Sequence, residues 1–440
     1  MAESGRVVEK AIMIAGGTVV DASGSRRADV LIERGQITAV GTNLAPPKGV
    51  KVLDAEGCWV TPGLVDLHTH LREPGGERAE TVASGARAAA LGGYSAVVAM
   101  PNTTPTIDSA SVVRDVQHLA EGALVDVAVA GAITVGRLGE QLAAIGDMAE
   151  LGVRIFTDDG SGVQDAQLMR RALEYASDLG VTLAEHCEDK ALANGGHMHE
   201  GAWSARLGIA GQPALAEEQM LARDLALVRL TGAPMHFLHL STAGSVKLVR
   251  DAKREGLPIT AEATPHHLLL TDAAVAGYDA RFKVNPPLRG DADVLAVRAG
   301  VADLTIDAIA TDHAPHPAEA KSEPFDLAPP GMIGLETALA VANGALVLTG
   351  LVEPAALIAS FTSRPAHIAG LAESGHGGPV AAGAAGNVCV FDPSARWLVD
   401  PKRMASRSQN SPFSGDELTG KVRHNVVFGE VVVEEGVATR

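Results

Sequence analysis

Between residues 64 and 311, short apolar stretches alternate with helix-like stretches, and this alternation constrains the fold of the chain more than any other feature. The apolar stretches are typical of buried strands and comprise residues 64–67, 95–100, 125–130, 153–157, 181–186, 234–240, 258–263 and 307–311. Most of them are separated by helical patterns, at residues 79–91, 138–151, 164–179, 214–230, 243–254 and 293–303. Strands that alternate with helices form a parallel sheet. Eight such strands predict an α/β fold, the TIM (β/α)8 barrel.

Both ends of the chain have a different pattern. Short strand-like stretches with tight turns fill residues 11–62, and the same pattern returns between residues 387 and 435. Apolar runs around glycine-containing turns indicate hairpins. We therefore predict a small β-sandwich domain formed by residues 1–62 and 378–440 together, and a barrel domain formed by residues 63–377.

Composition and charge narrow the class of partner. The 440 residues include 36 Lys and Arg against 53 Asp and Glu, a net charge of -17, which argues against nucleic acid or an anionic membrane surface as the partner. No apolar run approaches the ~20 residues of a membrane span, and the first ten residues lack the apolar core of a signal peptide. Three cysteines are too few for a disulfide framework. We predict a cytoplasmic protein that acts on a small molecule.

Residue types that bind metals recur where the predicted barrel strands end, which is where active sites of such barrels lie. They are His68, His70, Asp158, Asp159, His186, His239 and Asp312. The His68 and His70 side chains leave the same face of a strand. Imidazoles and carboxylates of this number can hold two divalent metals such as zinc, which activate water and polarise a carbonyl. A further carboxylate can transfer the proton, so we predict hydrolysis or closure of a cyclic amide.

The motifs along the chain also resemble those of a known family. GLVDLHTHLREPG, FTDDG, EHCED, LHLST, ATPHHLLL, KVNPPLR, ATDHAPH and GLET are similar to motifs of dihydroorotases of the bacterial class I type, in the cyclic amidohydrolase superfamily. The resemblance covers essentially the whole chain. It implies a zinc enzyme that interconverts L-dihydroorotate and N-carbamoyl-L-aspartate, the third step of de novo pyrimidine (UMP) biosynthesis. Two alternatives stay open: another cyclic amidase (dihydropyrimidinase, hydantoinase or allantoinase), or a non-catalytic scaffold for aspartate transcarbamoylase.

The resemblance assigns metal ligands residue by residue. It implies that His68, His70 and Asp312 bind one zinc ion, and that His186 and His239 bind a second. An aspartate of the FTDDG motif would bridge the two ions, and its spacing to His186 favours Asp159 over Asp158. Many relatives use a carboxylated lysine as the bridge, but no lysine follows the fourth strand here. Lys283 is the nearest alternative, and it lies in a different motif, KVNPPLR.

The resemblance also implies roles at the substrate. Asp312 is similar to the catalytic acid–base, and Arg72 to the residue that binds the substrate carboxylate, for which a guanidinium is suited. The other implied substrate contacts are His70, Asn102, Asn285, His316, Pro330 and Gly331. Residues 317–331 are rich in Pro and Ala and are predicted to form a mobile loop. A homodimer, and a complex with aspartate transcarbamoylase, are the expected assemblies.

The other residues of metal-binding type are expected to have structural roles. By strand alternation, His236 is expected to face the barrel exterior, away from the side of His239. Asp158 is expected to hydrogen-bond near the site without touching metal. We interpret the other histidines and a cysteine as structural: His197 and His199 in a loop, His266, His267 and His313 near the site, and Cys187 as a small buried residue.

Overall fold

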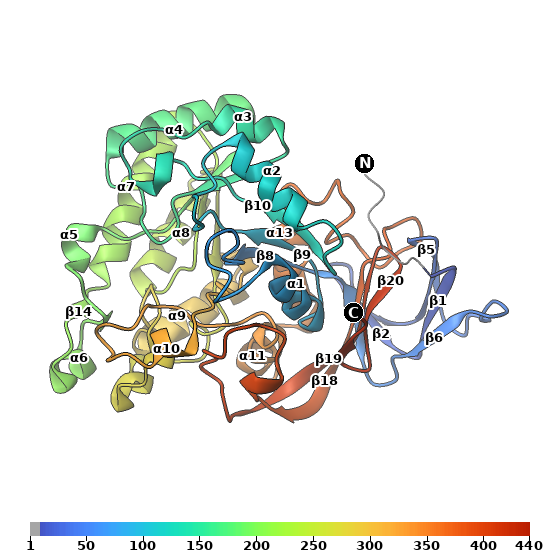
Figure 1. The fold of residues 1–440 in the computed structure, drawn as a ribbon. Coiled ribbons are helices and arrows are strands. Elements are labelled where there is room, and N and C mark those ends of the chain that lie inside the picture. The colour runs from blue at the N-terminus through green and yellow to red at the C-terminus, as the bar shows by residue number, and fades with distance from the viewer. Residues whose placement is uncertain (1–8) are drawn as a thin grey trace.

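The structure is a computed structural model that describes residues 9–440. Residues 1–8, which belong to the stretch predicted to lack a signal peptide, lie outside the described part. Figure 1 shows strands surrounded by helices, and beside them a sheet-rich part in which blue N-terminal strands and red C-terminal strands lie together. Among residues 9–440, no helix is both long enough and apolar enough to cross a membrane.

The strands that the helices surround form a parallel barrel of eight strands. They are β8 (Leu64–Thr69), β9 (Tyr94–Ala99), β10 (Asp126–Val129), β11 (Ile155–Thr157), β12 (Thr182–Glu185), β15 (Met235–Phe237), β16 (Ile259–Ala263) and β17 (Ala308–Ile309). Hydrogen bonding joins them in two groups, β10-β9-β8 and β11-β12-β15-β16-β17. Parallel bridges from Gly131 to Phe156 and from Thr69 to His313 connect the two groups at both edges. The predicted TIM barrel is confirmed.

Helices cover the outside of the barrel (Figure 1). The longer ones are α1 (Val82–Leu91), α2 (Ala110–Leu119), α4 (Ala166–Leu179), α7 (Leu215–Thr231), α8 (Ala243–Arg254), α9 (Asp291–Ala302) and α12 (Pro354–Phe361). The shorter ones are α3 (Ile145–Glu150), α5 (Lys190–Ala193), α6 (Ala202–Leu207), α10 (Ala318–Lys321), α11 (Ala338–Ala342) and α13 (Ser363–Ile368). Local sequence sets their ends: Asp165 caps α4 by accepting a hydrogen bond from Leu168 N at 2.8 Å, and Gly180 ends it in the left-handed conformation.

Two helical details differ from the sequence predictions. The helix predicted over residues 138–151 is only α3, preceded by a single 3-10 turn at Val135–Arg137. Gly139, which lies within the predicted range, adopts a left-handed conformation with a φ of 72°, which a right-handed α-helix does not accommodate. The stretch 317–331, predicted as a loop, contains α10, and Lys321 Nζ ties it by donating to Pro329 O at 2.9 Å.

Strands from both chain ends form two sheets beside the barrel. The N-terminal strands are β1 (Ala11–Ala15), β2 (Thr18–Asp21), β3 (Gly24–Arg27), β4 (Asp29–Glu33), β5 (Gln36–Gly41), β6 (Lys51–Asp54) and β7 (Trp59–Pro62). The C-terminal strands are β18 (Val388–Leu398), β19 (Glu417–Val427), β20 (Glu430–Glu434) and β21 (Val437–Ala438). One sheet has the order β5-β4-β1-β6 and the other β21-β20-β19-β18-β7-β2-β3, so the second combines both ends. Buried side chains such as Ile14, Val60 and Val390 share one apolar cluster. The domain boundaries at residues 62/63 and 377/378 stay a prediction.

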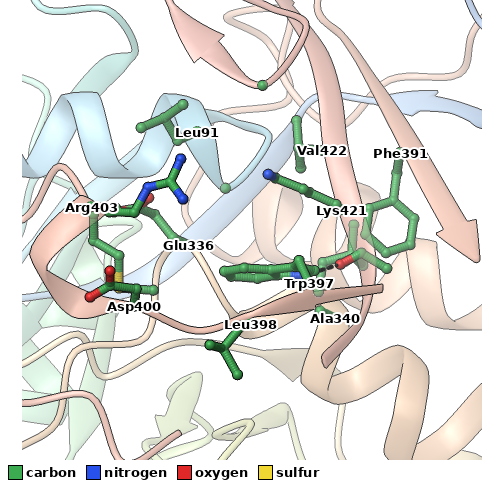
Figure 2. Close-up of a pocket in the computed structure, with 15 residues that line it drawn as sticks. Leu91, Glu336, Ala340, Phe391, Trp397, Leu398, Asp400, Arg403, Lys421 and Val422 are labelled. Carbon is green, nitrogen blue, oxygen red and sulfur yellow. Dashed lines mark hydrogen bonds between the residues drawn. The ribbon is translucent and has the colours of Figure 1, made fainter. Parts of the chain in front are cut away.

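A pocket of about 300 Å³ lies where the barrel meets the C-terminal strands. Figure 2 shows Arg403 and Lys421 extending toward each other from opposite sides, next to the indole of Trp397. Trp397 Nε1 donates to Gly420 O at 2.8 Å, and Lys421 Nζ lies 5.7 Å from the centre of the Trp397 ring. None of the residues predicted for the active site lines this pocket, so it is separate from that site.

Gly63 is the junction between the terminal sheet and the barrel, because it joins β7 to β8. Its N–H donates to Asn387 O at 2.9 Å, which ties the first barrel strand to the C-terminal part of the chain. A Cβ at this position would lie 2.6 Å from Ser95 Cβ, closer than two carbon atoms can pack. The junction therefore has no room for a side chain.

We expect Gly63→Ala to destabilise the protein by about 1–3 kcal/mol, the usual cost of overpacking a buried site. The measurement is the midpoint of urea unfolding, compared with wild type. Gly277→Ala is the matched control, because a Cβ there meets nothing within 4 Å. An equal shift in both variants would contradict the close approach at Gly63.

Candidate active site

The Asp159 carboxylate, which follows β11, lies at the centre of four histidines. Its Oδ1 is 3.4 Å from His68 Nε2, 3.6 Å from His186 Nδ1 and 3.4 Å from His239 Nε2. Its Oδ2 is 3.4 Å from His70 Nε2. The histidines come from the ends of β8, β12 and β15, so the barrel brings together residues that are far apart in the sequence.

The carboxylate of the neighbouring Asp158 makes hydrogen bonds to a loop and does not face the histidines. Its Oδ1 accepts hydrogen bonds from Ile133 N at 2.9 Å and from Thr134 N at 3.0 Å, and its Oδ2 accepts one from Thr134 Oγ1. These bonds hold the loop that follows β10 and direct the carboxylate away from the histidines. Of the two aspartates that the sequence left as candidates, the geometry favours Asp159 as the shared ligand.

The donor atoms fit a pair of metal ions. His68, His70 and Asp159 form one group whose potential ligand atoms lie within 4.8 Å of one another, and Asp159, His186 and His239 form a second such group. His68 Nε2 is buried and has no hydrogen-bond partner among residues 9–440, as expected for a nitrogen that serves a metal. Nitrogen and carboxylate oxygen suit zinc. No lysine of the described chain lines the pocket next to these groups.

Burial and neighbouring charges shape the protonation states. Burial raises the pKa of the Asp159 carboxyl, but His68, His186 and His239 lower it by more, so it lies well below the usual range. Burial and the nearby Arg72 hold the pKa of His70 well below its usual value, which leaves this imidazole neutral, as a metal ligand must be.

Asp312 is the second carboxylate at the histidine cluster. Its Oδ1 lies 3.2 Å from His70 Nε2 and 3.5 Å from His68 Nε2. Burial raises the pKa of Asp312 to about 7, although His68 and Arg72 oppose the shift. A carboxyl group that titrates near neutral pH suits general acid–base catalysis.

A cavity of about 250 Å³ opens above the cluster. It is lined by His70, Arg72, Asn102, Asp159, Gly160, His186, Asn285, Asp312, Ala314, His316, Pro330 and Gly331. The structure thus brings every residue predicted to contact substrate to one cavity. The Arg72 Nε donates to Pro315 O at 3.2 Å, and Asn102 Nδ2 donates to Asp159 Oδ2 at 3.1 Å, so both side chains are oriented before any ligand binds.

Glu262 on β16 is a functional residue that the sequence analysis missed. Its Oε1 lies 3.0 Å from His68 Nδ1, and its Oε2 lies 3.1 Å from His236 Nε2. A carboxylate on the far nitrogen of a metal-binding histidine orients the ring and raises its basicity. The available signal was an ionisable residue within an apolar strand, Ile259–Ala263.

The same contact corrects the prediction for His236. Instead of facing the barrel exterior, His236 is fully buried and hydrogen-bonded to Glu262. The alternation used for the prediction holds only within a regular strand. Here β15 ends at Phe237, and His239 has the left-handed φ of 30°, so the parity between His236 and His239 is lost.

Glu188 is a second residue that the analysis missed. Its Oε2 lies 3.5 Å from His186 Nε2 and accepts hydrogen bonds from Asn285 Nδ2 at 2.7 Å and Gln212 Nε2 at 3.0 Å. Burial opposes ionisation of Glu188, but His186 and Asn285 lower its pKa to about 2. This carboxylate therefore orients a predicted metal ligand and a predicted substrate contact together. Its position within the EHCED motif was the available signal.

The remaining histidines lie outside the cluster. His313 Nε2 is 3.2 Å from Glu80 Oε2, and His267 Nε2 is 3.1 Å from Pro286 O. His199, on the short strand β13 (Met198–His199), contacts the buried Arg289. Cys187 is buried, and burial raises the pKa of its thiol well above the usual value.

Comparison with known proteins gives consistent matches. A family model described as Dihydro-orotase-like matches residues 57–245. A dihydroorotase of Pelotomaculum thermopropionicum is 48% identical over 428 residues, covering 97% of this chain and 99% of the relative. A dihydroorotase of Streptomyces coelicolor is 49% identical over 419 residues, covering 94% of this chain and 97% of the relative.

Solved structures with a similar fold are more distant in sequence. An L-hydantoinase (dihydropyrimidinase) from Arthrobacter aurescens superposes with a TM-score of 0.88 at 24% identity, covering 98% of this chain and 97% of that one. A dihydropyrimidinase from Brevibacillus agri has a TM-score of 0.85 at 22% identity, with coverage of 98% and 96%. At this identity the likeness concerns the fold alone.

We expect Glu262→Gln to weaken metal binding roughly 10–100-fold, because the amide replaces the carboxylate that orients His68. The measurement is competition for zinc against a chelating dye, which needs no enzymatic activity. The exposed Glu255→Gln is the matched control, since Glu255 pairs only with surface Arg229 among the described residues. Equal affinity in the two variants would exclude the orienting role.

Proposed function

The chain belongs to the dihydroorotase family of metal-dependent amidohydrolases, and from this premise we propose how its own residues interconvert L-dihydroorotate and N-carbamoyl-L-aspartate. The family reaction opens and closes a cyclic amide in pyrimidine synthesis. The observation that supports the substrate most directly is the position of Arg72, whose guanidinium lines the same cavity as Asp159 and Asp312. Dihydroorotate carries a ring carboxylate, whereas the rings hydrolysed by dihydropyrimidinases and hydantoinases do not.

Arg72 is suited to bind that carboxylate. Burial lowers its pKa to about 10, so the guanidinium stays charged at neutral pH. A planar guanidinium matches a carboxylate with two parallel hydrogen bonds. Asn102, Asn285 and His316 line the same cavity and would contact the amide groups of the ring, and the backbone at Pro330 and Gly331 would border it.

For the metal site we propose zinc, with two ions per subunit. His68, His70 and Asp312 would hold one ion, His186 and His239 the other, and Asp159 would be shared. Bound metal supplies an activated water and polarises the amide carbonyl. The close approach of the histidine nitrogens to Asp159 supports this arrangement, and a carboxylated lysine is not needed for it.

Asp312 is the proposed acid–base. In hydrolysis its carboxylate accepts the proton of the attacking water and then donates it to the departing ring nitrogen. In cyclisation the same group takes a proton from the attacking nitrogen and donates it to the departing hydroxide, which leaves as water. Burial raises the pKa of the Asp312 carboxyl to about 7, and a carboxyl group that is more basic than usual is suited to accept and return a proton.

The assemblies expected from the sequence stay predictions. They are a homodimer and a complex with aspartate transcarbamoylase, in the cytoplasm. The scaffold alternative, a chain without activity, is disfavoured because all of the expected metal-ligand residues are present and converge on Asp159.

We expect the zinc-supplied protein to turn over L-dihydroorotate but not dihydrouracil, hydantoin or allantoin, and to lose that activity when a chelator removes the metal. The same assay on Arg72→Ala is expected to show kcat/KM for L-dihydroorotate lower by roughly 10–100-fold, the loss of a charge-assisted hydrogen bond. Arg78→Ala is the matched control, because the Arg78 side chain is 83% exposed. Turnover of a ring that lacks the carboxylate would instead indicate a related amidase activity. No turnover of any of the four compounds would favour the non-catalytic scaffold.

We expect Asp312→Asn to lower kcat by about 10²–10⁴-fold, the usual contribution of a general acid–base, while the variant keeps much of its metal. Both directions of the reaction should slow, since the same proton is transferred in each. Steady-state kinetics and elemental analysis of the same sample are the measurements, with exposed Asp178→Asn as control. Turnover near the wild-type rate would rule out the acid–base role.

A further inference from the structure

The segment 399–416, which connects β18 to β19, contributes one buried side chain to the edge of the active site. Asn410 is 3% exposed. Its Nδ2 donates to Ala314 O at 3.0 Å and to Gly331 O at 3.1 Å. Its Oδ1 accepts from His316 N at 3.2 Å. One amide side chain therefore satisfies backbone groups from two stretches that both border the substrate cavity, although Asn410 does not line the cavity itself.

The two stretches meet closely at this point. Gly331 has a φ of +142°, and a Cβ there would lie 2.8 Å from His316 Nε2 and 2.9 Å from Ala314 O. His316 Nε2 also lies 2.8 Å from Pro330 O. The relative position of the two stretches thus determines where the His316 ring lies in the cavity wall.

The position of residues 314–316 also affects the orientation of the Arg72 side chain. The Arg72 Nε donates to Pro315 O at 3.2 Å, and its Nη2 lies 3.5 Å from His316 Nε2. Pro315 lies between the two residues that Asn410 holds, so a shift of residues 314–316 would move the carbonyl that orients the guanidinium. Asn410 is thus connected, through the backbone of residues 314–316, to Arg72, the side chain proposed to bind the carboxylate.

Other contacts hold the segment to the barrel independently of Asn410. Ser408 Oγ donates to Ala79 O at 2.7 Å, Arg407 N donates to Glu80 Oε1 at 3.1 Å, and Ser406 Oγ donates to Glu80 Oε2. Loss of the Asn410 amide should therefore leave the segment in place and loosen only residues 314–316 and 331.

We propose that Asn410 is a positioning residue, through which the C-terminal segment holds Arg72 and His316 in the geometry that binds the substrate carboxylate. The proposal rests on the proposed function. Because the carboxylate does not react, its contacts are similar in the ground state and the transition state. Such uniform binding affects KM more than kcat.

The test is steady-state kinetics of Asn410→Ala with L-dihydroorotate. We expect KM to rise ~10-fold, since hydrogen bonds that position the binding groups are lost, with kcat within about 3-fold of wild type and with unchanged metal content. Asn410→Asp keeps the size and the acceptor but places an oxygen against two carbonyl groups. Its KM should rise at least as much, and it carries the test if Asn410→Ala does not fold.

Ser408→Ala separates positioning from simple anchoring. It removes one attachment of the same segment but touches neither residues 314–316 nor Gly331, so it should lower the unfolding midpoint without raising KM. If both Asn410 variants have the KM of Ser408→Ala, the positioning role is overturned and the proposed function stands. If wild type itself fails to turn over L-dihydroorotate, the proposed function falls, and this inference falls with it.

Discussion

The convergence of four imidazoles on the Asp159 carboxylate is the interaction on which the rest of the structure depends. The five side chains are almost completely buried, and buried ionisable groups are costly unless they are paired or bind a metal. They come from the ends of four strands, β8, β11, β12 and β15, and β9 and β10 separate β8 from β11, so a closed barrel is needed to bring them together. The arrangement places in the interior nitrogen atoms such as His68 Nε2, which makes no hydrogen bond within residues 9–440, so a bound cation would stabilise the folded chain as well as serve the reaction.

Around this centre, carboxylates and amides hold the participating groups in place. Glu262 fixes the His68 ring, Glu188 joins His186 to Asn285, and Asp158 secures the loop beside Asp159. A site that must hold its geometry within a fraction of an ångström needs such supporting contacts. The arrangement explains why so many polar side chains are fully buried at one end of an otherwise apolar barrel.

Periodicity and motif were enough to predict much of this molecule, for reasons that are physical. Apolar strands and amphipathic helices leave a local pattern, so the barrel and the strands of the two ends could be identified. Spacing along one strand placed His68 beside His70, and spacing to His186 favoured Asp159. The substrate contacts, by contrast, followed only from the family resemblance, because no local pattern indicates that Asn102 and His316 face one cavity.

What the sequence could not supply depends on contacts between distant residues. The pairs His68–Glu262 and Ala314–Asn410 are 194 and 96 residues apart, and neither partner identifies the other. Irregular backbone accounts for two predictions that the structure contradicts. The left-handed conformation at His239 invalidated the alternation that placed His236 outside, and the one at Gly139 interrupted the helix predicted over residues 138–151.

The position of segment 399–416 near the end of the chain has a consequence for biosynthesis. Ribosomes synthesise a chain from its N-terminus, and domains begin to fold as they emerge from the ribosome. All eight barrel strands and every predicted metal ligand are made before residue 313, whereas Asn410 emerges almost a hundred residues later. A nascent chain can therefore assemble its metal-binding residues well before the side chain that positions part of the cavity wall has been synthesised.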